Sequence, residues 1–97
     1  MSEKYKILSE EDIQKELQSL SGWQLKQNGL KQEFKFKNFI EAFAFISKVA
    51  ICAEKLNHHP EIFNAYNKVI ISGLCTHDAD GAITTLDIDL AHQISKL

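Results

Sequence analysis

The sequence has little of what would place it in several common protein classes. It contains two cysteines, one proline and no apolar run long enough to cross a bilayer, and its first residues lack the apolar segment of a secretory signal peptide. Cys52 and Cys75 are too few and too far apart for a disulfide framework or a C-x-x-C site. A formal net charge of -2 disfavours direct binding to DNA or RNA, which requires clustered lysine and arginine. We therefore expect a soluble, cytoplasmic protein with no membrane or nucleic-acid partner.

The chain does have enough apolar residues to form a core. Hydrophobic residues make up 44% of its 97 positions, so we expect a single domain over residues 1–97. A domain of this size leaves much apolar surface exposed. Association with further copies of the chain is therefore expected if a sheet edge or face is uncovered.

The first third of the chain predicts a helix followed by a hairpin. Ser9 precedes three acidic residues and then apolar residues at helical spacing, which predicts a helix over about residues 10–20. The Asn-Gly dipeptide at 28–29 suits a type I′ turn between two alternating strands. A two-residue loop there would place Leu25 opposite Gln32, on the face that looks toward the core.

A broad apolar stripe predicts that the longest helix follows, from a cap at Asn38 to about Leu56. Phe45 and Cys52 fall outside this stripe, which indicates a second face that another subunit could cover. The helix must end before Pro60, because the residue preceding a proline disfavours the α conformation. The stripe comprises Phe39, Ala42, Phe43, Ile46, Val49, Ala50, Ala53 and Leu56.

The remainder predicts two strands, over 61–66 and 68–76, and a third helix. The alternation in the second strand slips by one residue, which a β-bulge at Ser72-Gly73 would repair. A turn at Asp80-Gly81 precedes Thr84-x-x-Asp87, which resembles a capping box at the start of the helix. The order α-β-β-α-β-β-α predicts an α+β fold, with a layer of helices on an antiparallel sheet.

The adjacent histidines His58 and His59 are the strongest indication of chemistry. Neighbouring residues on a helix project about 100° apart, so the pair is poorly spaced to chelate one metal ion. Glu54 lies one turn before His58 and would fix its tautomer. His77 follows the last strand, and an antiparallel sheet could bring it to the same cleft. Alternatively, the two histidines are exposed residues that end a helix, and Glu54 is a solvated charge. His92 lacks a partner in the sequence pattern and is read as structural.

The ordered set of motifs resembles the pterin-4a-carbinolamine dehydratase family. The run AEKLNHHPEIFNAYNKV, then THDADG and a Thr-x-x-Asp helix start, matches the family's glutamate, His-His-Pro, Tyr-Asn-x-Val strand, Thr-His and glycine turn. This resemblance implies a four-stranded antiparallel sheet with helices on one face, assembled into a homotetramer that is a dimer of dimers. It also implies a 4a-hydroxytetrahydrobiopterin dehydratase, which forms quinonoid dihydropterin and water during tetrahydrobiopterin recycling and needs no metal or other cofactor.

The resemblance also assigns the site residue by residue. It implies that His58, His59, His77 and Glu54 are catalytic. By this resemblance, His58 and His77 perform acid/base catalysis around the 4a-hydroxyl and N5, and His59 serves in binding or base catalysis. Imidazole suits both tasks because it titrates near neutral pH. The residues implied to line the pterin site are Asn57, His58, His59, Cys75, Thr76, His77 and Asp78.

The chain departs from the family pattern in three places. Ile62 stands where relatives often have an aromatic residue, the strand before Thr76 is one residue longer, and the turn near Ala82 gains one residue. The first insertion coincides with the bulge inferred at Ser72-Gly73. A bulge there would absorb the insertion and leave His77 in place.

An alternative function belongs to a different class. Animal relatives are known as a dimerisation cofactor of a homeodomain transcription factor, so the chain could serve mainly as a module that binds a protein partner. A version of the site with few histidines would favour that reading. Because all three are present, we expect an enzyme.

Overall fold

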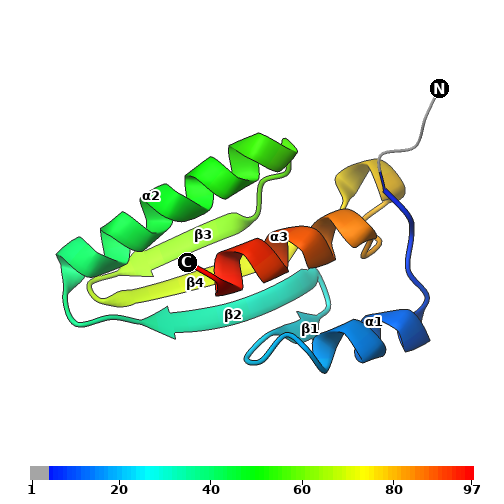
Figure 1. Ribbon diagram of the computed structural model, residues 1–97, viewed down its shortest axis with the longest axis horizontal. Helices are drawn as coiled ribbons and strands as arrows, with labels where there is room; N and C mark the ends of the chain where they lie inside the picture. Colours follow the sequence, from blue (N-terminus) through cyan, green and yellow to red (C-terminus); the bar gives the residue numbers. More distant parts are fainter. Residues whose placement is uncertain (1–4) are drawn as a thin grey trace.

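The structure, a computed structural model, describes residues 5–97 and forms a layer of helices on an antiparallel sheet (Figure 1). The expectation that the N-terminus carries no signal peptide falls partly on residues 1–4, which lie outside this range. The element order confirms the predicted α+β fold, and the strands are arranged β1-β2-β4-β3. The elements are α1 (Glu10–Leu17), β1 (Gln24–Lys26), β2 (Gly29–Lys35), α2 (Phe39–Leu56), β3 (Glu61–Ala65), β4 (Lys68–Leu74), a short 3-10 helix η1 (His77–Ala79) and α3 (Thr85–Ser95).

Helix α1 begins where the sequence predicts and ends earlier. The Ser9 hydroxyl accepts a hydrogen bond of 3.1 Å from the Asp12 backbone N–H, which confirms the cap. The helix ends at Leu17. The N–H groups of residues 18–20 donate to the carbonyl three residues back, which is the pattern of a 3-10 helix. Gly22, at φ +89°, then turns the chain into the first hairpin.

That hairpin turns one residue earlier than predicted, so Leu25 pairs with Leu30 and the expected pairing with Gln32 is wrong. Gly29 is not a turn residue but the first residue of β2, at φ +130°. A Cβ atom at Gly29 would lie 2.7 Å from the backbone of Leu74. The glycine is therefore needed for the close approach of β4, which sequence alone does not reveal.

Helix α2 buries most of the predicted stripe, but the stripe is shifted so that Phe45 and Cys52 replace Phe39, Phe43 and Ala50. Phe39 and Phe43, both in the predicted stripe, are 50% and 53% exposed. Phe45, predicted to lie off the stripe, is buried, with its ring centroid 4.7 Å from that of Phe34 and 4.9 Å from that of Phe36. The stripe was ambiguous because α2 is apolar on both faces. Phe34 of β2 and Phe36, just after it, select Phe45. The buried and half-buried residues of α2 are Ala42, Phe45, Ile46, Val49, Cys52, Ala53 and Leu56.

Strand β4 contains the predicted bulge. Leu30 of β2 lies opposite Leu74, and Gln32 lies opposite Ile71, so Ser72-Gly73 together face one residue of β2. Gly73 has φ +59°, a conformation that favours glycine. The extra residue restores the alternation, because Ile71 and Leu74 are both fully buried.

A closed loop over residues 76–82 connects β4 to α3. Thr76 and Ala82 pair in an antiparallel bridge, and the Thr76 N–H donates to the Ala82 carbonyl at 3.0 Å. Asp80 and Gly81 both have positive φ and reverse the chain, which confirms the predicted turn. Ala82 is thus part of the pair that closes the loop.

The apolar core lies between the sheet and helices α2 and α3. Trp23, at the start of the first hairpin, is buried and its Nε1–H donates to the Ser95 hydroxyl at 2.8 Å, which ties the hairpin to the end of α3. Within residues 5–97, no helix has both the length and the apolar character needed to span a membrane. The largest fully buried apolar side chains are Leu20, Leu30, Ile71, Leu74, Leu90, Ile94, Val49 and Val69.

Candidate active site

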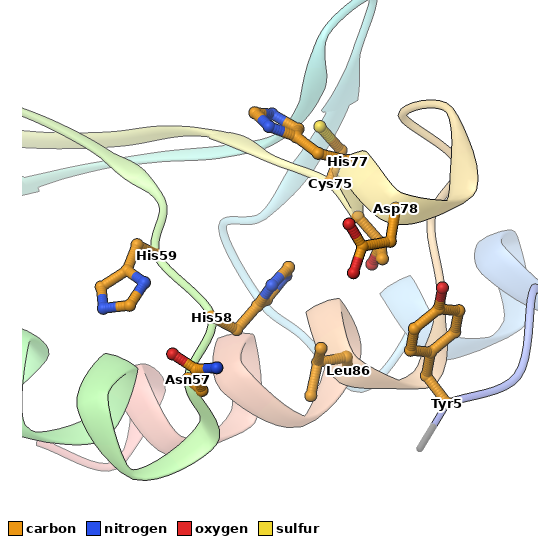
Figure 2. A pocket seen from close by; sticks show the side chains of 9 residues that line it. Tyr5, Asn57, His58, His59, Cys75, His77, Asp78 and Leu86 are labelled. Carbon is orange, nitrogen blue, oxygen red and sulfur yellow. The ribbon is translucent and has the colours of Figure 1, made fainter. Parts of the chain in front are cut away.

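A cleft of ≈ 370 Å³ opens where the end of α2, the loop after β4 and the start of α3 meet (Figure 2). The three histidines of the sequence motifs all line it, and so does every other residue that the resemblance assigns to the pterin site. Glu54, the fourth residue assigned to catalysis, does not line it. The lining residues are Tyr5, Asn57, His58, His59, Cys75, Thr76, His77, Asp78 and Leu86.

The end of α2 sends the two adjacent histidines in different directions. Asn57 has left-handed backbone angles, φ 50° and ψ 47°, and the His58 N–H donates to the Ala53 carbonyl at 2.9 Å. Asparagine is among the few residues that adopt this conformation readily at a helix end. The chain leaves the helix axis at this point. As a result, His58 is buried and His59 is exposed.

A buried carboxylate holds His58. Its Nε2 lies 2.5 Å from Oδ1 of Asp87, and the two residues are 9% and 0% exposed. The second oxygen, Oδ2, accepts hydrogen bonds of 2.8 Å from the Thr84 backbone N–H and from the Thr76 hydroxyl. One carboxylate thus joins the end of α2, the loop after β4 and the first turn of α3.

This contact determines which nitrogen of His58 is available to a ligand. A carboxylate accepts hydrogen bonds, so Asp87 favours the tautomer with its proton on Nε2. Nδ1 is then the nitrogen left for the cleft. It accepts a proton when the ring is neutral and donates one when the ring is charged. The contact therefore fixes the orientation of an imidazole that lines the cleft.

Glu54 contacts His59, and its predicted contact with His58 is wrong. Oε2 of Glu54 lies 2.5 Å from Nε2 of His59, and the two side chains are 76% and 54% exposed. The prediction failed because the left-handed residue Asn57 turns His58 away from α2 and toward α3. An ion pair this exposed is held only weakly.

Sequence reasoning missed three contributors to the site. Asp87 was recognised only as the third helical residue of the capping box, which is present as predicted. Its contact with His58 spans 29 positions, and the signal available was an acidic residue at a buried helix start. Leu86, which the sequence motifs do not single out, is half-buried and lines the cleft. Tyr5 lies far from every motif. Ile62, where relatives often have an aromatic residue, lies outside the cleft.

The Cys75 thiol forms part of the cleft wall. Burial raises the pKa of this thiol, and the negative charges of Asp87 and Glu61 raise it further. The thiol therefore remains protonated at neutral pH. It serves as a small polarizable surface and is a poor nucleophile.

The fourth histidine, His92, lies apart from the other three. His92, on α3, lies outside the cleft with its Nε2 4.0 Å from Glu16 Oε1. Across residues 5–97, three or more histidine, cysteine or acidic side chains are nowhere grouped so that they could hold a metal ion.

Comparison with known proteins identifies relatives along almost the whole chain. Residues 6–97 match the family model described as pterin 4 alpha carbinolamine dehydratase. The chain belongs to this dehydratase family. A relative from Prochlorococcus marinus (strain MIT 9312) is 48% identical over 91 residues, which cover 94% of this chain and 93% of the relative. A relative from Sulfurisphaera tokodaii is 47% identical over 92 residues, which cover 95% and 97%. Both are provisionally named pterin-4-alpha-carbinolamine dehydratases.

A solved structure extends the likeness to the fold. The crystal structure of a protein from Brucella melitensis, described as a transcriptional coactivator/pterin dehydratase, superposes with a TM-score of 0.86. Its sequence is 42% identical, and the match covers 93% of this chain and 96% of the Brucella chain. Membership of the dehydratase family, inferred from motifs in the sequence, is confirmed.

In this dehydratase-family chain, the carboxylate partners of His58 and His59 are expected to differ in their effect on stability. Asp87→Ala leaves a buried imidazole and two buried hydrogen-bond donors without their acceptor, so the free energy of unfolding should fall by roughly 3 kcal/mol. Glu54→Ala removes an exposed partner and should change it by no more than about 1 kcal/mol. Urea unfolding followed by circular dichroism measures both. Equal losses in the two variants would contradict the structural role assigned to Asp87.

Proposed function

We propose that this chain dehydrates 4a-hydroxytetrahydropterins to quinonoid dihydropterin and water by histidine acid/base catalysis, a reaction that supports tetrahydrobiopterin recycling. One observation carries the proposal. His58, oriented by a buried carboxylate, shares a cleft with His59 and His77 in a chain of the pterin-4a-carbinolamine dehydratase family.

The reaction requires one proton donor and one proton acceptor. The C4a–O bond breaks as the hydroxyl gains a proton and departs as water. The lone pair of N5 forms the C4a=N5 double bond, and the N5 proton passes to a base. Imidazole serves either task near neutral pH, and each such transfer contributes on the order of 10²–10⁴ in rate. Nothing is oxidised or reduced, so no redox cofactor is required.

The positions of the histidines support acid/base roles for His58 and His77. His58 comes from the end of α2 and His77 from the loop after β4, on another side of the cleft (Figure 2). Two groups on different walls can serve two atoms of one bicyclic substrate. His59 is assigned to binding or base catalysis. Asn57 and Asp78 offer an amide and a carboxylate to the polar edge of the pterin.

A direct assay tests the reaction. We expect the purified protein to accelerate the breakdown of a 4a-hydroxytetrahydropterin, followed by its ultraviolet absorbance. The rate should be unchanged in EDTA, because the proposed steps use only imidazoles. A rate no faster than that of the uncatalysed breakdown would refute the dehydratase proposal. Activity lost in EDTA and restored by zinc would refute the metal-free mechanism.

A substitution at His77, which follows the bulged strand β4, tests the proposed catalytic site. His77→Ala should reduce turnover at least about tenfold, because a proton-transfer group is lost. Its melting temperature should hardly change, since the side chain is exposed. His92→Ala is the matched control, because His92 lies outside the cleft, and it should retain the parental rate. Parental turnover in a folded His77→Ala protein would remove His77 from the mechanism.

We also propose that the chain assembles into a homotetramer. Ile40, Phe43 and Ile51 form an exposed apolar stripe at helical spacing on the outer face of α2. Strand β3, with Phe63 53% exposed, forms one edge of the sheet and has unpaired backbone groups there. Both surfaces suit contacts between copies.

Light scattering tests the assembly. The parent protein should have the mass of a tetramer at micromolar concentration. Phe43→Asp should lower that mass, because a carboxylate in an apolar interface has no partner. A monomer mass for the parent across that concentration range would refute the tetramer.

A further inference from the structure

Tyr5 lines the cleft but belongs to none of the histidine motifs. It is half-buried and lies in the segment that precedes α1, more than 50 positions before the other lining residues. Apart from the histidine imidazoles, its ring is the only aromatic side chain among the residues that line the cleft. The acid/base mechanism gives it no role.

The backbone after Tyr5 is fixed against the start of α3. The Lys6 N–H donates to the Thr85 hydroxyl at 3.0 Å, and the Thr85 N–H donates to the Lys6 carbonyl at 2.9 Å. Two residues on, the Leu8 N–H donates to the Ile83 carbonyl at 3.0 Å. Figure 1 shows this segment passing the loop and the first turn of α3. The backbone that follows Tyr5 is therefore hydrogen-bonded to Ile83 and to Thr85, the two chain neighbours of Thr84.

The cleft has two chemically different ends. Figure 2 shows His59 at one end of the view and Tyr5 at the other, with His58 and Leu86 between them. Tyr5 stands beside Leu86, and its hydroxyl points toward the part of the cleft that carries Asp78. The histidine end supplies proton transfer, and the end with Tyr5 and Leu86 supplies an aromatic and an aliphatic surface. Such a surface suits a flat, conjugated ring.

We propose that Tyr5 binds the flat, conjugated part of the substrate's pyrimidinone ring through the face or edge of its phenol ring, and so helps to select pterin-like heterocycles. This rests on the proposed dehydratase function, which supplies a substrate whose pyrimidinone ring is conjugated and flat except at the tetrahedral C4a. Tyr5 is assigned to binding and not to proton transfer. Because the part of the ring that it contacts keeps its shape during the reaction, losing the contact raises KM and leaves kcat nearly unchanged.

The test compares four proteins: the parent, Tyr5→Phe, Tyr5→Ala and Ile7→Ala. The phenylalanine variant keeps the ring and removes the hydroxyl. Ile7 lies in the same segment, but its side chain is exposed and outside the cleft, so Ile7→Ala controls for disturbance of the backbone. The readouts are KM and kcat for a 4a-hydroxytetrahydropterin, and the Kd for 7,8-dihydrobiopterin, a flat pterin that carries no 4a-hydroxyl, measured by fluorescence quenching.

We expect Tyr5→Ala to raise KM and Kd at least about fivefold, the lower end of what stacking on an aromatic ring contributes. Its kcat should stay within about twofold of the parent. Tyr5→Phe and Ile7→Ala should bind as the parent does. Parental KM and Kd in Tyr5→Ala would overturn the inference. Equal weakening in Tyr5→Phe would assign the effect to the hydroxyl, and equal weakening in Ile7→Ala would assign it to the segment; either result overturns ring binding.

The binding readout separates this inference from the proposed function. If the parent binds 7,8-dihydrobiopterin but does not turn over the 4a-hydroxytetrahydropterin, the dehydratase proposal fails while Tyr5 is still judged by Kd. If the parent turns over the substrate and Tyr5→Ala is unaffected, only the inference about Tyr5 fails. A parent that does not bind the dihydropterin overturns the inference directly.

Discussion

Both the fold and the site depend on the hydrogen bonds that the buried carboxylate of Asp87 accepts. A fully buried carboxylate is costly unless its oxygens are satisfied, and here His58, Thr76 and Thr84 satisfy them. Each partner lies on a different segment, so the carboxylate fixes the end of α2, the loop after β4 and the start of α3 relative to one another. The cleft lies where these three segments meet. Its geometry therefore follows from a contact that also stabilises the protein.

Two carboxylate–histidine pairs lie within a few residues of each other but in different surroundings. The pair of His58 and Asp87 is shielded from water, where electrostatic interactions are strong and poorly screened. The pair of His59 and Glu54 is exposed, so solvent and salt weaken it. His58 is therefore held in a fixed orientation, whereas His59 is held only loosely. The left-handed conformation of Asn57 creates this difference, because it separates the directions of two neighbouring side chains.

The sequence predicted the features that depend on local physical rules. The caps at Ser9 and Thr84 follow from hydrogen bonds within a few residues, and the bulge at Gly73 follows from a slip in the alternation of one strand. The element order and most of the residues around the cleft were also accessible, the latter because ordered motifs resemble a known family. Long-range packing was not accessible. The hairpin register depends on the backbone of Leu74, and the buried face of α2 depends on which side chain meets Phe34 and Phe36.

The same distinction explains the site residues that were missed or misassigned. Glu54 was paired with His58 because helical spacing was extended past the residue at which the helix ends. Asp87 contacts His58 across 29 positions, and the segment that carries Tyr5 is bonded to Thr85 across 79 positions; no local pattern identifies such contacts. An acidic residue in a capping box is normally explained by the helix alone. Its second partner becomes visible only when the end of α2 is placed against α3.

Thr76 holds the loop after β4 in place beside the cleft. Its backbone pairs with Ala82, and its hydroxyl contacts both Asp87 and Thr84, so its position is fixed from two directions. The bulge at Ser72-Gly73 lies before Thr76 in the chain, and the bridge to Ala82 closes the loop after it. His77 follows Thr76 directly in the chain. Its place in the cleft is therefore set by a residue that the buried carboxylate of Asp87 holds in position.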